Sequence, residues 1–88
     1  MIRKKLENYL GKMVTVVLFD SYTVTGILCK TGIEKYKNNP NLYIPKNRYF
    51  IEFPHLINAF GNHCISPLFR CSHVKKLTEV HSAKIHRA

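Results

Sequence analysis

The strongest structural signal in the chain is the stretch GKMVTVVLFDSYTVTGIL, which occupies residues 11–28. Its first half, residues 13–19, is rich in β-branched and aromatic residues, as β-strands are. Apolar side chains occupy both alternating sets of positions there, so we expect this strand to be covered on both faces. Asp20 and Ser21 predict a turn. A second strand follows over residues 22–28, in which Gly26 predicts a bend or the close approach of another backbone segment.

An amphipathic helix is predicted before this stretch. Ile2, Leu6, Tyr9 and Leu10 recur at helical spacing, with charged and polar residues on the opposite face. The helix should cover about residues 2–10, and Gly11 should end it because glycine tolerates a left-handed backbone. Such a short helix is marginal alone, so we expect it to dock on an apolar surface.

Three further strands are predicted in the second half of the chain. Residues 49–53 form the third, which Pro54 ends, and residues 64–69 and 73–80 form the fourth and fifth. Pro67 lacks a backbone N–H, so its strand should lie at a sheet edge or carry a bulge. The expected fold class is mostly β, an N-terminal α-helix followed by a five-stranded, strongly bent barrel. One domain is expected over residues 1–80, its barrel at about 12–80, with a basic flexible tail at 81–88.

Charge gives the first indication of function. The chain has 14 lysines and arginines against 5 acidic residues, a formal net charge of +9. Such an excess attracts polyanions through the release of counterions, so nucleic acid is the expected partner. The alternatives are a purely solubilising charge or contact with an acidic protein. A membrane partner is not expected, because no long apolar run or lipidation signal is present.

The interruption at about residues 30–48 is an extended basic loop. It contains Asn-Asn-Pro-Asn and Pro-Lys-Asn turn signals, and loops of this length are often functional. Single-stranded nucleic acid could stack on its tyrosines while its cations attract phosphates. Alternatively, the tyrosines pack the loop onto the barrel and the cations are solvated; we favour packing for each tyrosine and basic contact for the loop as a whole. The residues concerned are Lys35, Tyr36, Lys37, Tyr43, Lys46 and Arg48.

Catalysis and metal binding have little support in the sequence. Three cysteines and the lack of a signal peptide predict free thiols in a reducing, cytoplasmic location. A zinc site is disfavoured because the pairs His63-Cys64 and Cys71-x-His73 lack the usual ligand spacing. The acidic residues are scattered and no nucleophile–base set is present, so we expect neither an enzyme nor a cofactor.

Two segments resemble the motifs of the Sm-like proteins, the superfamily that includes the LSm proteins and Hfq. Residues 11–28 are similar to the first Sm motif, which has a Gly, alternating apolar residues, an Asp before a turn and then Gly-x-Leu. Residues 68–77, LFRCSHVKKL, are similar to the second motif, in which Arg-Gly precedes a small polar residue, a variable position and Val. Arg70, Ser72 and Val74 match this pattern.

This resemblance implies a five-stranded Sm-like, SH3-like barrel capped by the helix. It further implies that subunits join edge to edge, the fourth strand of one pairing with the fifth of the next. The result is a homo-oligomeric ring, for which we expect about five to seven subunits. Rings of this family bind single-stranded, often U-rich, RNA near the pore. The resemblance therefore implies RNA contact at Arg70 and Ser72.

The chain departs from the family pattern at two places. The family's Asp and Met-Asn pair, whose Asn reads the base, has no counterpart in residues 31–36, TGIEKY, and Cys71 stands where Gly is usual. The alternative function is therefore a structural or assembly ring without the usual RNA pocket. A second register also exists, because residues 62–66, NHCIS, resemble the Lys-His-Ala-Ile-Ser stretch of Hfq at three positions. The register through Arg70 has more matches, and we prefer it.

Overall fold

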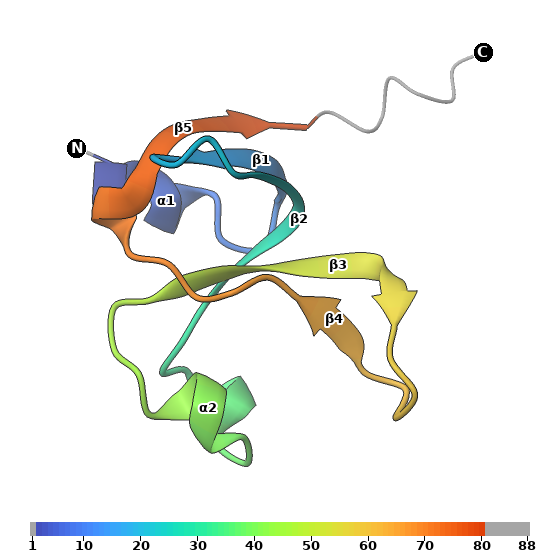
Figure 1. The fold of residues 1–88 in the computed structure, drawn as a ribbon. Helices are drawn as coiled ribbons and strands as arrows, with labels where there is room; N and C mark the ends of the chain where they lie inside the picture. The colour runs from blue at the N-terminus through green and yellow to red at the C-terminus, as the bar shows by residue number, and fades with distance from the viewer. Residues whose placement is uncertain (1, 81–88) are drawn as a thin grey trace.

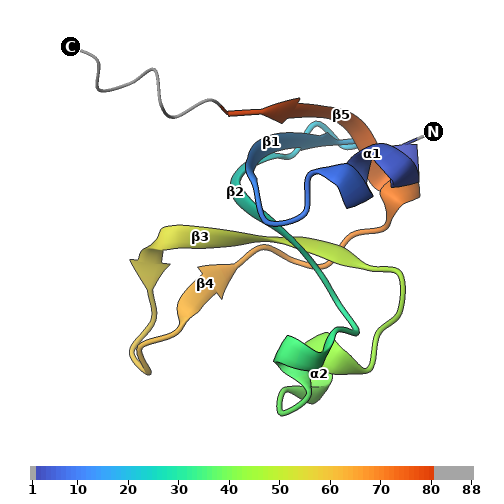
Figure 2. The same ribbon diagram turned by 180° about the vertical axis from the view of Figure 1, so that it is seen from behind.

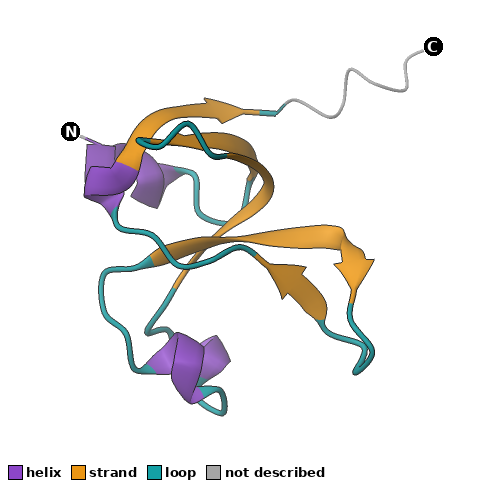
Figure 3. Cartoon of the chain, in the orientation of Figure 1, coloured by secondary structure: helices purple, strands orange, loops and turns teal. Residues whose placement is uncertain are grey.

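One antiparallel sheet of five strands forms most of the structure, a computed structural model that describes residues 2–80 (Figure 1, Figure 3). The strand order is β4-β3-β2-β1-β5. The predicted basic tail, residues 81–88, lies outside the described residues. Along the chain the elements are α1 (Ile2–Asn8), β1 (Met13–Leu18), β2 (Thr23–Lys30), η1 (Glu34–Tyr36), α2 (Pro40–Tyr43), β3 (Tyr49–Ile57), β4 (His63–Ile65), η2 (Cys71–His73) and β5 (Val74–Glu79), where η is a 3₁₀ helix.

The bend of the sheet is located in β2. Residues 23–27 of β2 pair with β1, whereas residues 27–30 pair with β3. Gly26 lies at this changeover, and a Cβ atom placed on it would lie 2.5 Å from both the carbonyl oxygen of Glu52 and Cγ2 of Ile51. The close approach predicted from Gly26 is therefore confirmed. It lets β2 pass from the layer of β1 and β5 to the layer of β3 and β4 (Figure 2).

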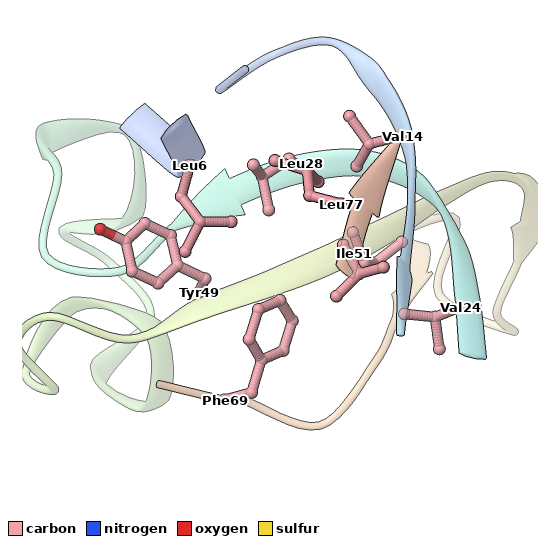
Figure 4. Close-up of a cluster of buried hydrophobic side chains, with 9 residues drawn as sticks. Leu6, Val14, Val24, Leu28, Tyr49, Ile51, Phe69 and Leu77 are labelled. Carbon is pink, nitrogen blue, oxygen red and sulfur yellow. The ribbon is translucent and has the colours of Figure 1, made fainter. Parts of the chain in front are cut away.

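The core fills the space that the bend creates (Figure 4). Alternate residues of the first two strands point into it, as the alternation in residues 11–28 predicts, and α1 covers it with Leu6. The predicted docking of the helix is therefore confirmed. Gly11, at φ +85°, donates its N–H to Leu28 O over 2.8 Å and fixes the path from α1 into β1. The cluster consists of Leu6, Val14, Val16, Val24, Leu28, Tyr49, Ile51, Phe69 and Leu77.

The sheet is not closed into the barrel that the sequence predicts. β4 and β5 are its two outer strands, and among residues 2–80 no ladder joins them. The segment between them instead crosses the open side of the bend, where Tyr49 and Phe69 exchange backbone N–H···O=C bonds of 2.8 Å. β4 has only three residues and pairs with β3 alone among residues 2–80.

Several predicted boundaries were also wrong. β3 continues past Pro54. The β3–β4 ladder is interrupted between Phe53 and Ile57, so no partner requires the N–H that Pro54 lacks. The predicted fourth strand stops at Ile65, before Pro67. The first strand ends at Leu18, before the exposed Phe19, and its cover is unequal: Val14 and Val16 are buried, whereas the residues of its other face are half-buried. The predicted loop, called the arm below (residues 31–48), contains η1 and α2.

Candidate nucleic-acid interface

The structure brings Arg48 and Arg70 together. Tyr49 and Phe69 form an antiparallel bridge, so the residues just outside it, Arg48 and Arg70, are neighbours across the two segments. Because alternate side chains leave opposite faces, both arginines lie on the side away from the core that holds Tyr49 and Phe69. Arg70 is exposed, and Arg48 is half-buried with its Nη1 donating to Lys46 O over 2.9 Å. The two are called the arginine pair below.

No carboxylate of the described residues neutralises the arginine pair. Residues 2–80 form two ion pairs, Lys30–Glu7 at 2.7 Å and Lys37–Glu34 at 3.3 Å, and neither includes an arginine. Like charges that face each other across paired strands destabilise a fold. The arrangement is therefore better suited to an external anion than to fold stability.

Ser72 lies one step further along, in η2. It is exposed, and η2 packs against α1. Arg3, on α1, donates to the Asn47 side chain over 3.4 Å, so a third arginine lies at this end of the molecule. Arg3 was missed as a site residue because nothing in the sequence relates position 3 to position 47.

A groove lies in the arm, and its lining extends to Asn47, the residue before Arg48. It has a volume of about 510 Å³, lies between the end of β2 and α2, and is lined by Lys30, Thr31, Gly32, Tyr43, Ile44, Lys46 and Asn47. The backbone of the arm lies against Gly32, whose N–H donates to Leu42 O over 2.9 Å. Gly32 has φ +80°, a conformation that favours glycine. We call this cavity the arm groove.

Glu7 fixes one wall of the arm groove. Its Oε2 accepts hydrogen bonds from Lys30 Nζ over 2.7 Å and from Tyr49 Oη over 2.6 Å, which joins α1 to β2 and β3. The hydrogen bond from Lys30, followed by that from Tyr49, holds the pKa of the Glu7 carboxyl below its ordinary value. Burial, together with the bond to Glu7, raises the pKa of Tyr49 to about 12. Lys30 therefore lines the groove with much of its charge already compensated.

The other predicted loop residues belong to a different environment. Tyr36 packs on Phe50 with ring centroids 5.6 Å apart, and burial raises its pKa. Lys35 Nζ lies 5.6 Å from the centroid of the Tyr36 ring, and Lys37 is paired with Glu34. None of the three lines the arm groove. The packing interpretation thus describes Tyr36, and the arm divides into a packed part and a groove-lining part.

Metal-ligating residues are dispersed in the part of the chain that the structure describes. His63 and Cys64 belong to β4, whereas Cys71 and His73 belong to η2, and no group of three or more potential ligands forms between residues 2 and 80. The three cysteines are free thiols, each half-buried. Among the same residues, no helix has the length and apolar character needed to cross a membrane.

Comparisons with known proteins identify no relative of this chain. No family model, no curated protein and no solved structure matches the chain. The Sm resemblance therefore rests on its two motifs, and the functional argument rests on the arginine pair, the arm groove and the two outer strands, which have one strand partner each among residues 2–80.

Proposed function

We propose that this chain is a ring-forming, Sm-like protein that binds single-stranded RNA at the end of the sheet where β3 begins. The arginine pair carries the proposal. Two arginines from segments 22 positions apart in sequence flank one backbone bridge, and neither has a carboxylate partner among residues 2–80. Guanidinium groups bind phosphate bidentately and stack on bases, so a polynucleotide would satisfy both and relieve their repulsion.

The register of the second motif supports this position for the RNA. With Arg70 aligned to the motif, the Arg-to-Val stretch spans η2, the connection into β5. The rival alignment through residues 62–66 would place His63 within β4, beside the hairpin that joins β3 to β4. Under the first alignment the motif arginine is Arg70, the neighbour of Arg48, whereas under the second neither arginine corresponds to a motif residue.

The sheet edges support assembly into a ring. β4 and β5 lie at opposite edges, and each has a strand partner on one side only among residues 2–80. Free edges invite pairing with another chain. A β4-to-β5 contact joins two different surfaces, which generates a closed ring when the rotation between subunits allows it. The proposed ring has about five to seven subunits.

A structural or assembly ring without an RNA pocket is the second candidate. Residues 31–36 lack the Met-Asn pair that reads the base in the family which the chain resembles. The hairpin joining β3 to β4 also exposes Leu56, Ile57 and Phe60, the last to 87%. Exposed apolar clusters of this kind mark protein contacts.

Two matched double variants test the proposal. Arg48→Gln with Arg70→Gln and Lys35→Gln with Lys37→Gln each remove two positive charges, but only the first pair lies at the proposed interface. RNA binding is measured by fluorescence anisotropy at two salt concentrations, with light scattering to give the subunit number and circular dichroism to confirm folding. We expect the arginine variant to bind at least about tenfold more weakly and the lysine variant less than about threefold.

The possible results separate the candidates. Equal losses in both variants would mean that overall charge, not the arginine pair, attracts the RNA. A wild-type ring that binds no RNA even at low salt would support the assembly function. A wild-type monomer at micromolar concentration would contradict both.

A further inference from the structure

Tyr43 and Tyr22 are the two exposed tyrosines of residues 2–80, and only Tyr43 lines the arm groove. Tyr49 is buried and bonded to Glu7, Tyr36 packs on Phe50, and Tyr9 lies below the ammonium group of Lys12. Tyr43 is 41% exposed and lines the arm groove. Among residues 2–80, no aromatic ring packs on it and no ammonium group lies over it. Its ring is therefore available to a ligand in the groove.

Polar and apolar groups are combined around this ring. Lys46 is exposed and forms no ion pair within the described part of the chain. Asn47 accepts a hydrogen bond from Arg3 at Oδ1, so its Nδ2 remains a donor. Ile44 is 69% exposed beside Tyr43. The groove thus offers a cation, an amide donor and two apolar side chains within about 510 Å³, a volume within the ~300–1,000 Å³ typical of small-ligand sites.

We propose that the arm groove is a subsite for one unstacked nucleotide of a single strand. The base stacks on the Tyr43 ring, Ile44 covers its edge, and Lys46 contacts the adjoining phosphate. This inference rests on the proposed RNA-binding function and adds a second contact to it. Lys30 contributes less than Lys46, because its ammonium group is already bonded to Glu7.

The path of the chain connects this subsite to the arginine pair. Arg48 follows Lys46 and Asn47 in sequence, and its Nη1 donates to Lys46 O. The segment that leads from α2 into β3 meets the segment that leads from β4 to η2 at the start of β3, where Tyr49 bridges Phe69 (Figure 1). A strand that contacts the arginine pair with its backbone can therefore place the next base in the groove.

Such a subsite distinguishes a single strand from a duplex. Stacking on Tyr43 requires a base that is not already stacked between neighbours, which loops and single strands provide and a regular helix does not. The arginine pair and Lys46 attract the phosphates of either form. Removing the Tyr43 ring should therefore weaken single-strand binding selectively.

The experiment compares Tyr43→Leu with Tyr22→Leu in the full chain. Tyr22 is 48% exposed, like Tyr43, but belongs to the turn between β1 and β2 and lines a different pocket. The probes are a labelled ten-nucleotide RNA and a blunt RNA duplex containing the same strand, titrated by anisotropy at low salt. We expect Tyr43→Leu to weaken single-strand binding about five- to 150-fold, the loss expected from one base–aromatic stack, and duplex binding by less than twofold. Tyr22→Leu should change neither.

A second pair of variants keeps the test decisive if Tyr43→Leu disturbs the fold. Lys46→Gln and Lys37→Gln each remove one charge from the arm, and only Lys46 lines the groove. We expect Lys46→Gln to reduce the salt slope of single-strand binding by at least about 0.7, and Lys37→Gln to leave it unchanged.

The outcomes separate the two proposals. Wild-type binding of single strands, with Tyr43→Leu and Lys46→Gln equal to their controls, would overturn the subsite and leave the proposed function intact. A wild-type chain that binds neither probe would overturn both. Equal losses of single-strand and duplex binding in Tyr43→Leu would also overturn the subsite, because stacking would not be its mechanism.

Discussion

Replacing Gly26 with alanine tests the bend on which the whole arrangement depends. The added Cβ would lie 2.5 Å from the carbonyl oxygen of Glu52 and 2.5 Å from Cγ2 of Ile51. The oxygen belongs to the backbone of β3, and Ile51 is fully buried, so neither can turn aside. β2 and β3 would have to separate by roughly 1 Å to restore ordinary contact. That separation occurs next to the pairing of Ile27 with Glu52, where the β2–β3 ladder begins.

The expected loss of stability follows from this geometry. Inserting a methyl group into a packed interior costs about 1–3 kcal/mol, and a backbone neighbour on one side and a buried branched side chain on the other place Gly26→Ala near 3 kcal/mol. For a chain of this size each kcal/mol lowers the melting temperature by roughly 4–8 °C. The variant should therefore melt roughly 12–24 °C below the wild type.

Gly61→Ala is the matched control. It adds the same methyl group where no atom lies within 4 Å, but at φ +83°. Its cost is therefore backbone strain alone, about 1 kcal/mol. Thermal unfolding followed by circular dichroism at one protein concentration compares the two. If Gly26→Ala melts no lower than Gly61→Ala, the close approach of β2 and β3 does not limit this position and the reasoning fails.

Three further predictions concern α1 and the core. The lowered pKa of Glu7 means that its bonds stabilise the fold above the ordinary carboxyl pKa, and that this stabilisation is lost as pH falls through the lower folded value. The free energy of unfolding, measured by urea titration, should therefore fall more between pH 6 and pH 3 in the wild type than in Glu7→Gln, and equal decreases would contradict this. Tyr49→Phe removes the hydroxyl that donates to Glu7 over 2.6 Å and should cost about 1–2 kcal/mol at pH 7, with a smaller loss in the Glu7→Gln background; an unchanged melting temperature would show that the bond adds nothing. Leu77→Ala should cost about 2–5 kcal/mol because Leu77 is 4% exposed, and a loss below about 1 kcal/mol in urea unfolding would mean that β5 is loosely packed.

The sequence predicted the features that depend on neighbouring residues. The two strands within residues 11–28, the turn at Asp20 and the left-handed conformation of Gly11 follow from local propensity and backbone conformation, although α1 ends at Asn8 and not at residue 10. Gly26 was identifiable for a similar reason, since a glycine amid β-branched residues indicates a close contact even when the partner is unknown. Predictions of this kind need no knowledge of distant segments.

The predictions that failed depend on pairing between distant segments. Pro54 ends a strand only if a neighbour needs its N–H, and the interruption in the β3–β4 ladder is not encoded near it. Closure of the barrel depends on how far β4 extends. β4 ends at Ile65, before Pro67, and beyond it Phe69 pairs with Tyr49 at the start of β3. The candidate site likewise depends on contacts between distant segments. The basic loop was found from composition, but its division between a packed Tyr36 and a groove-lining Tyr43 required the tertiary structure.

Glu7 links the stability of the fold to the chemistry of the arm groove. A Lys30 side chain without a partner would compete with Lys46 for the same phosphate and would vary in position. With Glu7 bonded to Lys30 and Tyr49, the ammonium group is fixed below α1 and its charge is largely compensated. Among residues 2–80, the cations at this end without a carboxylate partner are then Lys46, Arg3 and the arginine pair. Removing the Glu7 carboxylate would therefore add positive charge at the groove while loosening α1. The proposed RNA binding should then become stronger and more salt-dependent in a less stable Glu7→Gln protein, because one more cation can contact phosphate, and this result would distinguish a structural role for Glu7 from a direct one.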